Sequence, residues 1–324
     1  MTQLIDRFLE ELNDESEQSP ERLEILRSLV LKVIELAELD PDTSDLRIAA
    51  TALTELLQSA QLFSSWREKP KLTVFGSART SSDSVLYEMA RQLSSDMAAR
   101  GWMTVSGAGP GIMEASSKGA GRASTLGINI DLPFEKGANE FIDTEQMHVA
   151  MKFFFTRKVA MTRGSKAFVA FPGGIGTMDE LFEILTLVHT GKTSPAPVVL
   201  VDEPGGDFWT RWLSFIDEAI IGGGYLDSID KRLFVVRYSV SEVIDDIESF
   251  YSNFIDFTKT ENGASMRLRR LPRAEIGRLN ASYPMFASNG GFRISTDDQL
   301  VFDFDGRDYV SLRRLIDELN HTNV

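Results

Sequence analysis

The segment from Phe171 to Glu180 reads FPGGIGTMDE, so one short turn brings together three glycines, a threonine and two carboxylates. A glycine-containing turn ahead of a helix presents free backbone N–H groups and the positive end of the helix dipole, which together bind an anion such as a phosphate. Asp179 and Glu180 follow within one helical turn, where a carboxylate disfavours phosphate binding unless it acts on an attached sugar. The Thr177-x-x-Glu180 spacing also fits a capping box, so a structural role for both residues stands beside the chemical one.

Two adjacent cations, Arg157 and Lys158, lie upstream of this turn in an otherwise apolar helical stretch, 153–163. Neighbouring residues on a helix point in different directions, so at most one of the two side chains faces solvent harmlessly. Two interpretations are open: long side chains that reach along the surface to water, or a cation that faces the same crevice as the carboxylates.

Two further glycine-containing turns, Gly76-Ser77 and Gly107–Gly111, follow other strand-like segments. Ligands of an open parallel sheet bind outside the carboxyl ends of its strands, where such turns gather. None of the three turns has the glycine spacing of a dinucleotide-binding fingerprint or the Lys-Ser/Thr pair of a P-loop, which argues against the simplest NAD and ATP sites. Glycines that serve tight turns alone remain the alternative.

The elements that must position these residues alternate between strands and helices. Strands are predicted at 71–75, 102–106, 127–132, 167–171, 197–201 and 234–238. Helices are predicted at 82–100, from the second turn to 121, at 153–163, from the third turn to 190, at 208–221 and at 241–257. Strands that are continuous apolar runs between helices indicate a parallel sheet covered on both faces. We therefore expect an α/β fold, a doubly wound, Rossmann-like domain over residues 70–257, with an irregular stretch between 132 and 153.

Both flanks of this domain carry additions. Residues 1–69 are predicted as an N-terminal helical extension, with one helix opening at Ser19-Pro20 and a second over 44–66. A linker is predicted at 258–263, followed by a small C-terminal α+β module over 264–324. Within that module we expect an arginine-rich amphipathic helix over 266–279, a hairpin formed by 291–295 and 299–304, and a closing helix over 309–319.

Composition narrows the function classes. The chain has 324 residues, 43% hydrophobic residues, a formal net charge of −14 and no cysteine. The missing cysteine excludes disulfides, zinc–thiolate sites, iron–sulfur clusters and cysteine nucleophiles. A field of this sign repels nucleic acid and anionic lipid at long range. No apolar run approaches the length of a membrane span, and the start has no leader pattern, so we expect a cytoplasmic protein without a nucleic-acid or membrane partner. The three histidines are scattered, and no metal site is expected.

Arg157-Lys158 followed by Pro172-Gly-Gly-Ile-Gly-Thr-Met-Asp-Glu180 resembles the signature of the Lonely Guy (LOG) family. Ser106–Glu114 (SGAGPGIME) and Ile130–Glu135 (IDLPFE) resemble the larger bacterial members of that family. The resemblance covers residues 70–245 and leaves the two terminal additions unexplained. One departure from the family pattern is the Gly-Ala-Gly-Pro-Gly turn, where relatives often have three consecutive glycines. Because of this departure, the resemblance does not predict the residues of the base pocket.

This resemblance implies a function. The family comprises cytokinin riboside 5′-monophosphate phosphoribohydrolases and related nucleoside 5′-monophosphate nucleosidases, which release a free base and ribose 5-phosphate without a cofactor. By similarity, Arg157 and Glu180 are the catalytic residues. The residues that would bind the substrate are Ser77, Gly109, Met113, Glu135, Lys158, Gly173, Gly174, Ile175, Gly176, Thr177 and Asp179. The resemblance also implies a homo-oligomer, a dimer by analogy with LOG relatives.

Two competing functions remain open at this stage. Molybdenum cofactor carrier proteins share the core and the glycine turns, so a nucleotide- or cofactor-binding carrier without hydrolase activity is the alternative. The arginine cluster between 267 and 278 raises the second alternative, a nucleic-acid module, although an amphipathic surface helix explains it better. The base could be adenine, an N6-modified adenine or a pyrimidine, and the "lysine decarboxylase" label of many relatives finds no pyridoxal phosphate site here.

Overall fold

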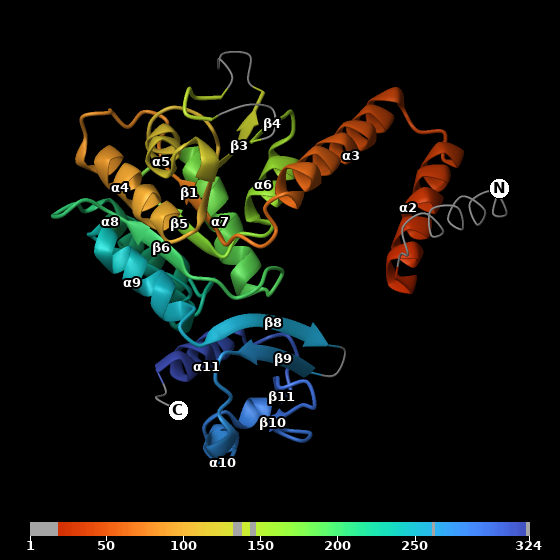
Figure 1. Ribbon diagram of the computed structural model, residues 1–324, viewed down its shortest axis with the longest axis vertical. Coiled ribbons are helices and arrows are strands. Elements are labelled where there is room, and N and C mark those ends of the chain that lie inside the picture. Colours follow the sequence, from red (N-terminus) through yellow and green to blue (C-terminus); the bar gives the residue numbers. More distant parts are fainter. Residues whose placement is uncertain (1–18, 132–137, 143–146, 261–262, 322–324) are drawn as a thin grey trace. The chain divides into compact units, whose positions relative to one another are not determined.

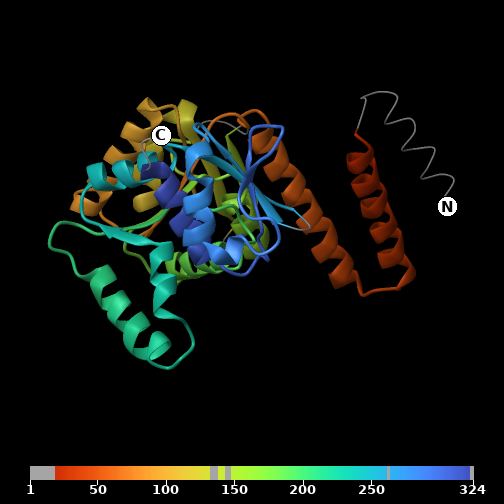
Figure 2. The same cartoon turned by 90° about the horizontal axis from the view of Figure 1, so that it is seen from below.

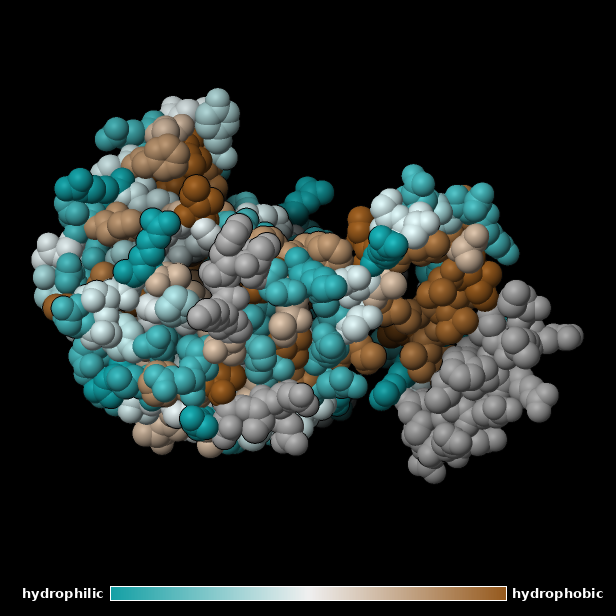
Figure 3. Space-filling model, turned by 90° about the horizontal axis from the view of Figure 1, so that it is seen from above, coloured by the Kyte–Doolittle hydropathy of each residue, from teal (hydrophilic) through white to brown (hydrophobic). Residues whose placement is uncertain are grey.

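The computed structural model describes residues 19–131, 138–142, 147–260 and 263–321. The chain divides into two compact units, residues 1–54 and 55–324, and each is described by itself. The first unit contains α2 (Pro20–Glu38) and the start of α3 (Thr43–Ser64). As predicted, Ser19 begins α2, because its side chain accepts a hydrogen bond from the Arg22 N–H. Apolar side chains gather on the surface of these two helices (Figure 3).

A parallel sheet forms the centre of the second unit (Figure 1). Among the described residues it has seven strands, in the order β4-β3-β2-β1-β5-β6-β7, and every neighbouring pair is parallel. The strands are β1 (Lys71–Phe75), β2 (Met103–Ser106), β3 (Thr125–Ile130), β4 (His148–Met151), β5 (Ala167–Ala170), β6 (Val198–Val201) and β7 (Val235–Arg237). The predicted doubly wound α/β fold is confirmed.

Helices cover both faces of this sheet (Figure 2). One face packs against α4 (Val85–Ala99), α5 (Ile112–Ala120) and α9 (Val240–Phe250). The other packs against α6 (Phe154–Thr162), α7 (Ile175–His189), α8 (Phe208–Phe215) and Leu62 of α3. A π-helical segment, Ile216–Ile221, continues α8, and 3₁₀ turns lie at Arg122–Ser124 and Ser228–Leu233.

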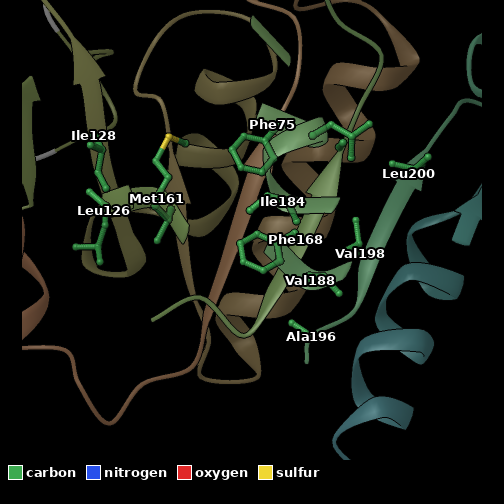
Figure 4. Close-up of a cluster of buried hydrophobic side chains, with 14 of the residues drawn as sticks. Phe75, Leu126, Ile128, Met161, Phe168, Ile184, Val188, Ala196, Val198 and Leu200 are labelled. Carbon is green, nitrogen blue, oxygen red and sulfur yellow. The ribbon is translucent and has the colours of Figure 1, made fainter. Parts of the chain in front are cut away.

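Alternate residues of each central strand enter the two cores. Phe168 of β5 lies in the cluster on the α6–α7 face, together with Phe75, Leu126 and Val198 (Figure 4). Its neighbour Val169 lies in the cluster on the opposite face. Because side chains alternate across a strand and both faces are covered, the central strands are mostly apolar along their whole length. This explains the largely apolar runs in the sequence.

The strand order creates a crevice. From β1 the chain builds β2, β3 and β4 on one side, and it then returns to form β5, β6 and β7 on the other side of β1. The loops after β1 and β5 therefore leave the sheet in opposite directions, which opens a ligand-binding crevice at the carboxyl ends of these two strands. The short strand β4, which the sequence left irregular, extends the sheet beyond β3, with Gly127 opposite His148.

The C-terminal residues form a second sheet, in the order β10-β11-β9-β8. Its elements are β8 (Phe254–Thr260), β9 (Gly263–Leu268), α10 (Ile276–Ser282), β10 (Arg293–Ile294), β11 (Leu300–Phe302) and α11 (Tyr309–His321), with 3₁₀ turns at Arg273–Glu275 and Pro284–Phe286. The predicted hairpin and closing helix are confirmed.

Three predictions for this part of the chain were wrong. The helix predicted over 241–257 ends at Phe250, and the described residues of the predicted linker, 258–260 and 263, belong to the antiparallel pair β8–β9. The arginine-rich helix predicted over 266–279 begins as a strand instead. Ala264, Met266 and Leu268 alternate into an aromatic core while Arg267 points outward, so the repeat is two residues rather than the helical period. Among the described helices, none is long and apolar enough to cross a membrane.

Candidate active site

Three glycine-containing turns meet at the carboxyl edge of the parallel sheet. The turn after β1 connects the other two, because the Ser77 N–H donates to Pro172 O at 3.2 Å and Ser77 O accepts from the Ile112 N–H at 3.1 Å. The second turn requires glycine where it meets the first. Gly111 has a φ of +67°, and a Cβ there would lie 2.3 Å from Ser77 O. The backbone thus holds the loops after β1, β2 and β5 as one surface.

The third turn leads directly into α7, and its geometry corrects one prediction. The helix begins at Ile175 with Gly174 as its N-cap, so Thr177 and Glu180 are the third and sixth helical residues. The capping box predicted for Thr177 and Glu180 is therefore wrong. Thr177 is buried and packs against Gly173, where a Cβ would lie 2.2 Å from Thr177 Oγ1. Because Gly174 has no side chain to cap the helix, the first N–H groups of α7 are available to an anion.

Arg157 reaches this crevice from α6. Its Nε donates to Ile128 O at 3.0 Å, and its Nη2 lies 3.4 Å from Glu180 Oε1. The two side chains are 10% and 12% exposed. Gly107 leaves the space for the guanidinium, because a Cβ at this position would lie 2.2 Å from Arg157 Nη2. Arg157 is thus a buried partner of Glu180, and the surface interpretation of this side chain was wrong.

Lys158 lies at the rim of the same crevice. Its Nζ is 3.1 Å from Asp179 Oδ1 and 2.8 Å from Glu183 Oε2, so it links α6 to the second and third turns of α7. Partial burial alone would lower the pKa of Lys158, but hydrogen bonds to Glu183 and Asp179 and the charges of these two carboxylates together raise it. The ammonium group therefore stays charged beside the three acidic residues of α7.

The Glu180 carboxyl has an unusual protonation equilibrium. Burial raises its pKa to about 7. Arg157 and Lys158 oppose this rise, while Asp179 and Glu183 add to it. A carboxyl group balanced between its two protonation states near neutral pH, at the centre of a crevice, is typical of a functional site.

The remaining predicted residues fall around this pair. Met113, in the first turn of α5, lies against the second glycine turn, since a Cβ on Gly109 would lie 2.8 Å from its Cε. A Cβ on Gly107 would clash with both Met113 and Arg157, so these two side chains both lie against Gly107. Glu135 lies outside the described residues. The structure therefore gathers the other predicted residues at one edge: Ser77, Gly109, Met113, Arg157, Lys158, Gly173, Gly174, Ile175, Gly176, Thr177, Asp179 and Glu180.

Comparison with known proteins identifies the family. A family model described as "Possible lysine decarboxylase" matches residues 96–247. The cytokinin riboside 5′-monophosphate phosphoribohydrolase of Mycobacterium tuberculosis is 31% identical over 169 residues, which cover 49% of this chain and 83% of that protein. This chain belongs to the LOG family.

Other relatives match over shorter stretches. The cytokinin riboside 5′-monophosphate phosphoribohydrolase LOG7 of Arabidopsis thaliana is 32% identical over 102 residues, or 32% of this chain and 45% of that protein. The chain thus spans about half the length of this curated LOG relative. Among solved structures, the molybdenum cofactor binding protein of Rippkaea orientalis is 22% identical and aligns over 56% of this chain and 97% of that one, with a TM-score of 0.42.

Sequence reasoning missed two residues of this LOG-family site and the role of a third. Gly107, named only as part of a glycine turn, makes room for Arg157, and Glu183 holds Lys158. Asn139 fixes the second turn, because its N–H and Nδ2 donate to Ala108 O at 2.8 and 3.1 Å while Ala108 has a φ of +63°. The helical spacing of Glu183 after Asp179 was a usable signal. Asn139 stands in an irregular stretch, where no pattern marks it.

Proposed function

We propose that this protein hydrolyses the N-glycosidic bond of a purine nucleoside 5′-monophosphate, with or without a substituent on N6, to a free base and ribose 5-phosphate. One observation carries the proposal. Glu180, a buried carboxylate on the helix that follows the third glycine turn, lies beside the guanidinium of Arg157 from α6. The relatives from M. tuberculosis and A. thaliana, both cytokinin riboside 5′-monophosphate phosphoribohydrolases, support the same reaction class.

The 5′-phosphate would bind at the N-terminus of α7. The backbone N–H groups from Gly174 to Thr177 and the helix dipole supply the attraction, and Gly173 keeps the turn close to the Thr177 side chain. A helix rises about 1.5 Å per residue, and its side chains lean toward its N-terminus. Glu180 therefore projects back toward the phosphate, at a distance that suits the ribose. Binding of the phosphate would hold the sugar over the carboxylate, which is catalysis by positioning.

The bond cleavage needs the groups found here. As the C1′–N bond breaks, its electron pair leaves with the base and positive charge develops on the sugar. The Glu180 carboxylate would stabilise this charge or take a proton from the water whose oxygen bonds to C1′. Arg157 would orient the substrate or polarise the departing base, which finally carries the proton. Lys158, held by Asp179 and Glu183, would keep the local charge balanced.

A homo-oligomer and a cytoplasmic location belong to the same proposal. Phe154, Phe155 and Val159 of α6 and Phe182 of α7 are exposed apolar side chains on the two helices that supply the site. Such a patch supports an interface between copies of the chain. A chain without cysteine has no need of an oxidising compartment, which supports the cytoplasm. Light scattering of the purified protein tests the oligomer directly.

A substrate panel tests the reaction. The protein is incubated with AMP, N6-isopentenyl-AMP, GMP, CMP and UMP, and with the nucleosides that lack the phosphate, and the released base is separated by chromatography. We expect base from one or more purine monophosphates and at least a hundredfold less from the matching nucleosides, because these cannot use the phosphate turn. Release of no base from any monophosphate contradicts the proposal. Tight binding without release supports the carrier alternative instead.

A further inference from the structure

Glu55 of α3 is a buried carboxylate outside the crevice, only 3% exposed. Burying a carboxylate is costly unless its oxygens are hydrogen-bonded. Glu55 Oε1 accepts from the Lys152 N–H at 2.7 Å, and Oε2 accepts from the Thr156 hydroxyl. Both donors belong to one short segment, so the two hydrogen bonds of Glu55 hold that segment against α3.

The segment is the N-terminus of α6. Phe153 is the N-cap of this helix and makes no side-chain cap hydrogen bond. Thr156 lies in the first turn, and its hydroxyl also lies 2.9 Å from Phe153 O. Glu55 therefore supplies, from a different helix, the hydrogen-bond acceptors that the start of α6 lacks in its own side chains.

The opposite end of α6 is also fixed. Met161 O accepts from the Thr73 hydroxyl at 2.9 Å and from the Ser165 hydroxyl at 3.0 Å. A helix of nine residues is too short to be stable without such external contacts. Arg157 follows Thr156 directly, so the place of its guanidinium depends on how the first turn of α6 is held.

We infer that Glu55 is a positioning residue of the active site, which holds the first turn of α6 so that the Arg157 guanidinium reaches Glu180. This inference rests on the proposed function, in which Arg157 and Glu180 form the reaction centre. It gives the part of α3 that belongs to the second unit, from Glu55 onward, a role in positioning the site.

The inference has a consequence at Glu180. The charged groups that face its carboxyl are Arg157 and Lys158 from α6 and Asp179 and Glu183 from α7. Both cations come from α6, so loosening this helix weakens the two influences that lower the pKa of Glu180. Glu55→Ala should raise the pKa of Glu180 by about one unit. It should also lower kcat roughly tenfold to a hundredfold, with a smaller change in KM, because the phosphate turn belongs to α7.

The experiment compares Glu55→Ala with two matched variants. Glu55→Gln keeps an oxygen for the Lys152 N–H, and its amide donates to the Thr156 hydroxyl while that hydroxyl donates to Phe153 O, so it should restore the wild-type behaviour. Ser239→Ala removes the cap of α9, a hydrogen bond from the Glu242 N–H to the Ser239 hydroxyl, and α9 packs on the opposite face of the sheet from α6 and α7. This variant should lower Tm without changing the protonation of Glu180. The Glu180 carboxyl is titrated by NMR in protein labelled at the glutamate carboxyl carbons, with Glu180→Gln to assign its signal, and kcat is measured from pH 5 to 9.

The outcomes separate the two proposals. A raised pKa of Glu180 and a lower kcat in Glu55→Ala, but in neither matched variant, support the inference. A titration unchanged in Glu55→Ala, or shifted equally in Ser239→Ala, overturns it. If Glu55→Ala does not fold, Thr156→Val removes the same contact from its other side and is judged by the same criteria. The NMR titration measures the pKa of Glu180 without turnover, so it decides the role of Glu55 even in a protein that is inactive. Failure of the wild-type protein to release base contradicts the proposed function only.

Discussion

The Arg157 guanidinium lies 3.4 Å from the Glu180 carboxylate, and the two groups reach each other from different helices. Arg157 comes from α6, which precedes β5, and Glu180 comes from α7, which follows it. Because both side chains are almost excluded from water, their mutual attraction is stronger than that of a surface pair. It is nevertheless too weak to cancel the burial of Glu180, whose pKa stays near 7. This balance makes the pair testable in several independent ways.

The first prediction concerns turnover. Glu180→Gln keeps the shape of the side chain but removes its charge, so kcat/KM for the best monophosphate should fall at least a hundredfold. KM should change less, because the phosphate turn is left intact. Base release measured by chromatography gives both constants. Glu88→Gln, at an exposed ion pair with Arg91, controls for the same chemical change elsewhere. Wild-type turnover in Glu180→Gln would remove Glu180 from the mechanism.

The second prediction concerns the pH dependence of the reaction. A carboxylate that stabilises a cationic sugar or accepts a proton from water must be ionised. The kcat/KM of the wild-type protein, which reports the free enzyme, should therefore rise with pH through about 7 and then level off. A decrease over this range would instead make the protonated carboxyl the active form. The expected profile is measured with buffers of constant ionic strength, because the neighbouring charges are sensitive to salt.

The third prediction concerns stability. The Glu180 pKa is raised from 4.5 to about 7 on folding, so between these values the folded protein binds a proton that the unfolded chain has released. The free energy of unfolding contributed by this group is therefore complete below about pH 4.5, falls as the pH rises to about 7, and is constant above that. Glu180→Gln lacks this loss. The free energy of unfolding of Glu180→Gln should therefore exceed that of the wild type by near zero at pH 4.5 and by roughly 3 kcal/mol at pH 8. Urea unfolding at both values measures the difference, and an advantage that does not change with pH would contradict the raised pKa.

Much of the fold and part of the site could be predicted from the sequence. The apolar strands identify the parallel sheet because both of its faces are buried. The resemblance to the LOG family joins Arg157 and Glu180 in one site, and their helices both begin at the carboxyl edge of the sheet. The edge strand β4 and the strands β8 and β9 escaped prediction. β4 is short and only partly buried, and the arginine cluster that begins with Arg267 of β9 suggested a helix.

Other features of the site depend on tertiary contacts that no local pattern records. Thr177 and Glu180 have the spacing of a capping box, but α7 begins earlier in the sequence, at Ile175, so the two residues are free for other roles. Glu55 contacts Lys152 across 97 positions of the chain, and nothing in the sequence near either residue announces this bond.

The fourth prediction concerns Gly107. An alanine Cβ would lie 2.2 Å from Arg157 Nη2 and 2.7 Å from Met113 Sδ, so the guanidinium must move away from Glu180. Gly107→Ala should therefore lower kcat at least tenfold and raise the pKa of Glu180. Gly277→Ala in α10 is the matched control, because a Cβ there meets nothing within 4 Å. Retention of full activity by Gly107→Ala would show that the close contact between Arg157 and Glu180 is not needed for turnover.

The last prediction separates the fold of the phosphate turn from its chemistry. An alanine Cβ at Gly173 would lie 2.2 Å from the Oγ1 of the buried Thr177. Gly173→Ala should therefore lower the free energy of unfolding by about 1–3 kcal/mol and, at the same time, weaken substrate binding.

At Gly176 a Cβ meets nothing within 4 Å, and alanine suits the first turn of a helix, so Gly176→Ala should leave Tm unchanged or raise it slightly. If the phosphate lies against this turn, the added methyl group enters its place, and KM for AMP and the inhibition constant of ribose 5-phosphate should both rise roughly tenfold. Steady-state kinetics and thermal unfolding of the two variants give the comparison. A methyl group at this position must disturb a phosphate that is bound against the turn. If Gly176→Ala keeps the wild-type KM and the wild-type affinity for ribose 5-phosphate, the phosphate binds elsewhere in the crevice.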